Sequence, residues 1–104
     1  MLDGELYKGE FKDRNKDGIG TLFNDNWYYE GEFKEGNLEG FGIIHYNENN
    51  EDSKMKYEGQ FKNNESDGYG ILYFKDGSII NGEWKDNNVF GFAIETDWLI
   101  ILII

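Results

Sequence analysis

The chain has 104 residues, so we expect a single domain (1–104) that buries only about two-thirds of the surface its unfolded form exposes, without a deep core. Its 21 acidic and 10 basic side chains give a formal net charge of -11, which disfavours nucleic acid and membrane lipid as partners and favours a basic protein surface. The absence of cysteine excludes disulfides, thiol catalysis and Cys-ligated zinc, and the acidic start resembles no signal peptide, so we expect a cytoplasmic protein.

One motif occurs four times along the chain. Tyr7-Lys8-Gly9-Glu10-Phe11-Lys12 recurs from Tyr29, from Tyr57 and, more loosely, from Ile80, and in each copy a further glycine follows the first by nine residues. We therefore expect repeats at about 7–28, 29–56, 57–79 and 80–97. The predicted framework residues are Tyr7, Gly9, Phe11, Gly18, Gly20, Tyr29, Gly31, Phe33, Gly40, Gly42, Tyr57, Gly59, Phe61, Gly68, Gly70, Gly82, Trp84 and Gly91.

Each copy predicts two strands. In the first segment, Tyr-x-Gly-x-Phe places apolar groups at alternate positions, so one face of a strand is apolar and Lys8 and Glu10 lie on the other. The second segment, residues 40–46 for example, is rich in β-branched and aromatic residues and is typical of a second strand. We expect a loop between the two strands, a turn after the second, as at Asp76-Gly77, and an insertion loop over 47–56.

A single hairpin cannot bury its own apolar face, so the copies should stack side by side. The predicted fold class is all-β: an elongated, single-layer antiparallel sheet of four stacked hairpins. Glycines such as Gly31 would let an aromatic ring lie against the backbone or let the chain adopt positive φ.

The pattern Tyr-Glu-Gly-x-Phe-Lys followed by Gly-x-Gly, in units near 23 residues, resembles the MORN repeat family over about residues 6–97. The resemblance implies a row of hairpins that acts as a non-catalytic scaffold or protein-interaction module, cytoskeletal or close to a membrane. Its alternatives are a phosphoinositide-binding membrane adaptor and a regulatory fragment of a larger lipid kinase or lysine methyltransferase. The fourth copy departs from the pattern, with Ile80-Asn81 for Tyr-Glu and Ala93 for glycine, as expected of a capping repeat.

We expect no catalytic, cofactor-binding or metal-binding residues. Residues 13–18 match the first half of an EF-hand calcium loop, but position twelve of that loop would be Asn24 rather than glutamate. His45 occupies the slot of Phe23 and Tyr73 in other copies, so a packed or edge histidine is expected. The insertion acids Glu48, Glu51 and Asp52 are expected to be solvated, because a single sheet offers no glycosidase-like cleft.

Two further features bear on partners. Lys12, Lys34, Lys62 and Lys85 could form a stripe that touches lipid headgroups, but acidic or amide side chains two residues away weaken it. The run from Trp98 to Ile104 is too short to span a bilayer, so we expect it to cover a sheet edge or to support self-association through that edge.

Overall fold

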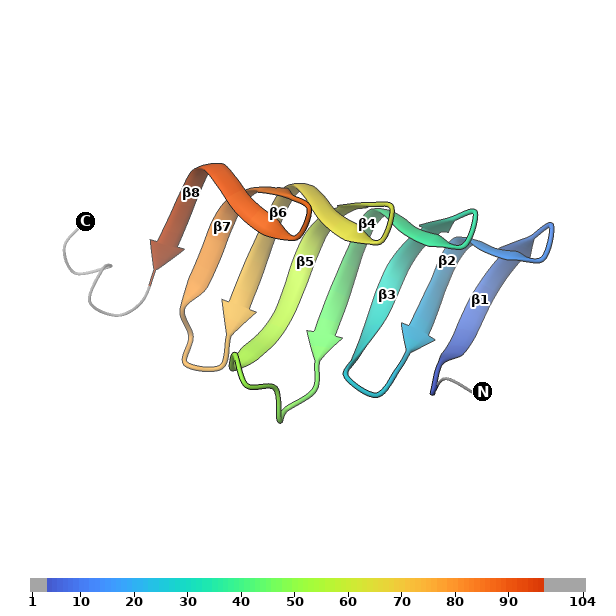
Figure 1. The fold of residues 1–104 in the computed structure, drawn as a ribbon, viewed down its shortest axis with the longest axis horizontal. Coiled ribbons are helices and arrows are strands. Elements are labelled where there is room, and N and C mark those ends of the chain that lie inside the picture. The colour runs from blue at the N-terminus through green and yellow to red at the C-terminus, as the bar shows by residue number, and fades with distance from the viewer. Residues whose placement is uncertain (1–3, 97–104) are drawn as a thin grey trace.

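The computed structural model describes residues 4–96 as one open sheet of eight antiparallel strands (Figure 1). The strands lie in chain order across the sheet, so each pairs only with its neighbours in sequence. The molecule measures 52 × 28 × 18 Å, as expected of a single layer. The strands are β1 (Leu6–Lys12), β2 (Asn15–Phe23), β3 (Trp27–Lys34), β4 (Asn37–Tyr46), β5 (Lys54–Lys62), β6 (Glu65–Phe74), β7 (Ile79–Lys85) and β8 (Asn88–Thr96). The predicted all-β fold of four stacked hairpins is confirmed.

The predicted loop between the two strands of each copy is present and is short, a turn of two residues. In the first hairpin Asp13 and Arg14 both have positive φ, at 51° and 72°, which is the signature of a type I′ turn. The other three hairpins turn at Glu35-Gly36, Asn63-Asn64 and Asp86-Asn87, again with positive φ throughout. The second strands therefore begin at residues 15, 37, 65 and 88, earlier than the apolar run that predicted them.

A row of glycines crosses the sheet at one level. Gly9 pairs with Gly20, Gly20 with Gly31, and the pairing continues through Gly42, Gly59, Gly70 and Gly82 to Ala93. The tyrosine two residues before the first glycine of a hairpin lies over this row: a Cβ on Gly42 would collide with the ring of Tyr29. The predicted steric reason for these glycines is confirmed, because their bare backbone provides the surface on which the rings pack.

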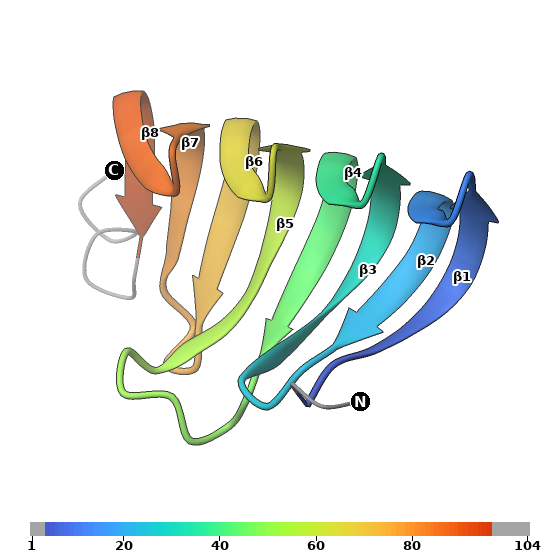
Figure 2. The ribbon, with the colours of Figure 1, turned by 45° about the vertical axis from the view of Figure 1, so that its right-hand side comes forward.

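The single layer has a core because each hairpin curls over at its turn end (Figure 2). Tyr29 is completely buried, and Phe33 and Phe61 are 3% and 4% exposed. Phe33 and Phe61 each pack edge-on between the tyrosine of their own hairpin and that of the preceding one. The ring centroid of Phe33 lies 5.0 Å from that of Tyr7 and 5.1 Å from that of Tyr29. This aromatic ladder continues through Phe61 and Tyr57 to Trp84. Its side chains are more completely buried than expected of a chain predicted to lack a deep core.

The curl starts at a β-bulge inside each hairpin. Between Gly31 and Phe33 the register with β4 shifts, and Gly40 adopts a φ of +73°. The Glu32 carboxylate then accepts the backbone N–H of Phe41 at 3.0 Å, in space that a side chain on Gly40 would fill. Glu10 and Gln60 hold the first and third bulges in the same way. The side chain that follows the first glycine of a repeat therefore serves as a hydrogen-bond acceptor in these three hairpins.

Hydrogen bonds at the turns join neighbouring hairpins. The N–H of Gly36 donates to the carbonyl of Lys16 at 2.9 Å, and Asn64 donates likewise to Leu38 at 3.1 Å. The side-chain oxygen of Asn64 also accepts the N–H of Leu38 at 2.9 Å. Because the second, third and fourth turns are each bonded to the hairpin before them, the curled ends form a continuous rim along the molecule.

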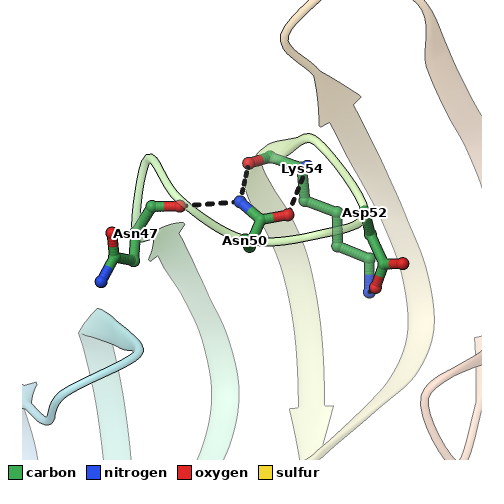
Figure 3. A network of polar contacts seen from close by, with 4 residues as sticks. All are labelled: Asn47, Asn50, Asp52 and Lys54. Carbon is green, nitrogen blue, oxygen red and sulfur yellow. Dashed lines mark hydrogen bonds and ion pairs between the residues drawn. The ribbon is translucent and has the colours of Figure 1, made fainter.

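The predicted insertion loop is shorter than expected, covering 47–53, because β5 already begins at Lys54. Asn50 closes it: its side-chain amide donates to the carbonyls of Asn47 and Lys54 at 2.7 and 2.8 Å, and its oxygen accepts the N–H of Lys54 at 2.8 Å (Figure 3). Asp52 lies 3.8 Å from the Lys54 ammonium. The loop thus fixes the start of β5. The predicted turn at Asp76-Gly77 is confirmed, since Ser78 N–H donates to Asp76 at 2.9 Å.

Candidate functional site

The curled hairpins form a groove on the aromatic face of the sheet. One cavity of this groove, about 320 Å³, runs from β3 to β7. Core side chains form its floor, the turn residues Asn64 and Asn87 form one wall, and the start of β3, the end of β4 and the start of β5 form the other. The lining residues are Trp27, Leu38, Ile44, Tyr46, Lys54, Tyr57, Phe61, Asn64, Ser66, Leu72, Trp84 and Asn87.

Three half-buried side chains give the groove its recognition chemistry. Trp27 and Tyr46 pair directly across β3 and β4, and the ammonium of Lys54 lies 5.4 Å from the centre of the Tyr46 ring. Lys54 is the one charged residue in the lining of this cavity. The groove is therefore suited to an apolar segment that carries a carboxylate or another acceptor, which would share the Lys54 ammonium with the exposed Asp52, 3.8 Å away.

None of these three residues was singled out from the sequence. Trp27 precedes its repeat motif and Lys54 lies at the end of the insertion, so neither belongs to the repeated pattern. The available signal was period two: Trp27 stands two residues before Tyr29 and so lies on the same face of the strand.

The predicted framework residues fall into distinct roles. The tyrosines and glycines described above build the ladder and the glycine row, and a second group of glycines, Gly18, Gly40 and Gly68, takes positive φ at the bulges. Gly91 lies in β8. Phe11 differs from expectation: it is 63% exposed, because no hairpin precedes it within residues 4–96 to supply the second tyrosine.

The motifs weighed for metal binding or catalysis lie in turns, strands and the insertion loop of the repeat structure. Residues 13–18 span a two-residue turn and the start of β2, and Asp17 accepts the N–H of Glu35 at 3.2 Å. Within residues 4–96, no three His, Cys, Asp or Glu side chains are placed to hold a metal ion. His45 stacks on Tyr28 with ring centroids 4.4 Å apart and lies 2.7 Å from Glu30. Glu48 and Glu51 are exposed in the insertion loop.

Of the two features that the sequence linked to partners, the structure describes the lysine stripe but not the tail. Lys12, Lys34, Lys62 and Lys85 end the four odd-numbered strands and are exposed, and none forms an ion pair in the part of the chain that the structure describes. The tail from Trp98 to Ile104 lies outside the described residues. No helix within 4–96 is long and apolar enough to cross a lipid bilayer.

The buried tyrosines of the aromatic ladder lead us to expect that the protein loses stability in alkali. Burial raises the pKa of Tyr29 and of Tyr57 far above the ordinary value of 10.0. Above pH 10 the unfolded chain therefore holds fewer phenolic protons than the folded one, and each of the two residues lowers the free energy of unfolding by about 1.4 kcal/mol per pH unit. Their stabilising contribution is complete below pH 10 and is lost as the pH rises toward the folded pKa.

Urea unfolding between about pH 9 and about pH 11 tests this prediction. Tyr29→Phe, which removes one of the two protons, should make the decline less steep. A free energy of unfolding that stayed constant over this range would contradict the burial of these phenols.

The repeated hairpin is also what a comparison with known families detects. The family model described as MORN repeat matches residues 7–27, 29–51 and 57–79, which together make up more than half of the chain. A search of curated proteins found no match. The matched segments begin at Tyr7, Tyr29 and Tyr57, the three tyrosines of the ladder. The β7–β8 hairpin lies outside them, and its Gly82 pairs with Gly70 of the glycine row. The chain belongs to the MORN repeat family.

Proposed function

We propose that the protein is a non-catalytic scaffold or protein-interaction module, and that its groove receives an apolar segment of a partner protein. The carrying observation is the cavity of about 320 Å³ with half-buried Trp27 and Tyr46 at its side. Aromatic side chains in partly enclosed positions are frequent anchors of protein interfaces. Lys54 adds a preference for an acceptor on the bound segment. We further propose a cytoplasmic setting, next to the cytoskeleton or a membrane.

Adjacent residues of β3 supply a matched pair of variants. Trp27 faces the groove and Tyr28 faces the opposite side of the sheet. Proteins captured from an extract of the native cell should be lost with Trp27→Lys and with Lys54→Glu, but kept with Tyr28→Lys, because only the first two change the groove. Thermal melts of all variants verify folding.

Capture of the same proteins by all four forms would contradict the groove as the binding site. The phosphoinositide-binding alternative rests on the exposed lysines that end β1, β3, β5 and β7. Sedimentation with vesicles that contain or lack phosphoinositide separates the two functions: binding that depends on this lipid would favour a membrane adaptor. If the chain were a regulatory fragment of a larger lipid kinase or lysine methyltransferase, a longer gene product that contains it should show that catalytic activity.

We also propose self-association through the open edge of β1. Phe11 is 63% exposed, whereas Phe33 and Phe61 at the equivalent positions are covered by the tyrosine of the preceding hairpin. A further strand on this edge would cover Phe11 and pair the backbone groups of β1 that have no strand partner within residues 4–96.

Sedimentation velocity over a range of concentrations tests this second proposal. The wild type should form larger species as its concentration rises, and Phe11→Lys should remain monomeric. Deletion of 98–104 examines the tail separately. If the wild type stays monomeric at every concentration, the edge does not pair, and if only the deletion abolishes association, the tail is responsible.

A further inference from the structure

The segment that follows β8 is apolar at every position. Residues 98–104 read Trp-Leu-Ile-Ile-Leu-Ile-Ile and carry no charge. A strand added at the edge of a single-layer sheet directs its side chains alternately to the two faces, so half of this segment would point away from the groove and into water. A run that is apolar throughout is instead typical of a segment enclosed on more than one side. The composition of the segment therefore favours the groove over the edge of the sheet.

An apolar path leads from β7 into the groove. Ile80 and Phe74 are half-buried and pack against the core, and they line another cavity, of about 370 Å³, between the insertion loop and the β6–β7 turn. Tyr46 and Trp27 continue the path in the cavity of about 320 Å³. The charged residues that line the cavity beside β7 are exposed: Asp52, Lys75 and Asp76. The path thus offers apolar contacts along its floor and keeps these charges at its margin.

The segment starts at the level of the sheet where this path lies. The even-numbered strands end at one edge of the sheet (Figure 1), and β8 ends there at Thr96. Pairing at the level of Thr96 continues across the sheet through Ile79, Tyr73, Lys56, His45 and Tyr28. Four strand spacings, about 19 Å, separate β8 from β4, and the stretch 97–104 can span up to about 26 Å when extended. The segment is therefore long enough to reach Tyr46, which follows His45 in β4.

We propose that residues 98–104 occupy the groove of their own chain and that a partner segment has to displace them. This inference rests on the proposed function of the groove and adds its regulation. Both segments would compete for Trp27 and Tyr46, and a tethered segment acts at an effective concentration on the order of millimolar. Only a partner that binds the groove more tightly than the chain's own segment would then be held.

Disulfide trapping tests the location of the segment, because the chain has no cysteine of its own. In the full chain, Tyr46→Cys with Leu102→Cys places one thiol in the groove and one in the segment. Under mild oxidation this pair should close within one chain at least about tenfold faster than the control pair, His45→Cys with Leu102→Cys. His45 is the neighbour of Tyr46 but stacks on Tyr28 on the opposite face, so the segment has equally far to reach. Thermal melts of the reduced variants verify folding.

Competition for the groove is measured without cysteines. The probe is a fluorescent synthetic peptide with the sequence of residues 98–104 and a polyethylene glycol tag for solubility. The full chain with Leu99→Ser, Ile101→Ser and Ile103→Ser has a polar segment that should leave the groove open. In fluorescence anisotropy this variant should bind the probe about tenfold more tightly than the wild type does. Adding Trp27→Lys should abolish the binding.

Equal closing rates for the two cysteine pairs would overturn the proposal, and so would a probe that binds the wild type and the serine variant equally or binds neither. A disulfide between two chains would also overturn it, because the segment would then lie in the groove of a second copy. Each of these results leaves the proposed function standing if Trp27→Lys still loses the captured proteins. Trapping in the groove together with capture that is unaffected by Trp27→Lys would support this inference and contradict the proposed function alone.

Discussion

Gly31→Val is expected to lower the free energy of unfolding by about 3 to 4 kcal/mol, a large part of the stability of a small domain. A Cβ at this position would lie 2.5 Å from the Cα of Gly42 and 2.6 Å from the carbonyl oxygen of Phe41. Both are backbone atoms of the paired strand, so they cannot move aside without breaking the register between β3 and β4. Valine adds two methyl groups to this contact.

Thermal and urea unfolding measure the effect, with Lys34→Ala as the control. Lys34 is exposed at the end of the same strand, so its loss should change the free energy of unfolding by no more than about 0.5 kcal/mol. If Gly31→Val were as stable as Lys34→Ala, the close approach of the two strands at the glycine row would be wrong.

Phe33→Ala is expected to cost about 3 to 4 kcal/mol, whereas Phe11→Ala should cost less than about 1 kcal/mol. The two residues occupy the same position in consecutive repeats, but Phe33 is 3% exposed between two tyrosine rings and Phe11 is 63% exposed beside one. Because the chemical change is identical, the difference between the two losses in free energy of unfolding measures what the preceding hairpin contributes to the core.

Urea unfolding at a protein concentration where the chain is monomeric gives both values. Equal losses for the two variants would mean that the preceding tyrosine adds nothing to the packing of Phe33. A large loss at Phe11 alone would mean that the edge of β1 is covered.

The repeated motif made most of the fold predictable, because residues spaced identically in four copies must adopt the same local structure. Tyr29, Gly31 and Phe33 were assigned to one face from their spacing alone, and the glycine row follows from the stacking of such strands. The turns were harder to predict. Asp13-Arg14 is not a typical type I′ pair, and its positive φ values arise because the bulge at Glu10 moves the strands into the register that closes there.

The bulge also explains why the site was not predicted. The sequence presents Glu32 as a surface charge, yet its carboxylate holds the N–H of Phe41 and allows the hairpin to curl. A flat sheet would have no groove, and Trp27, Tyr46 and Lys54 would then be unremarkable surface residues. The replacement of glutamate by Gln60 in the third copy was the available hint that an acceptor, and not a charge, is needed.

The most direct test of the stacked-repeat structure is the set of nuclear Overhauser effects between backbone protons of paired strands, α-protons at the non-hydrogen-bonded pairs and amide protons at the hydrogen-bonded ones. The structure predicts such contacts between hairpins, at the levels where Gly20 pairs with Gly31, Gly42 with Gly59 and Gly70 with Gly82, as well as inside each hairpin. Contacts inside the hairpins without any between them would show that the four ribbons fold but do not join into one sheet.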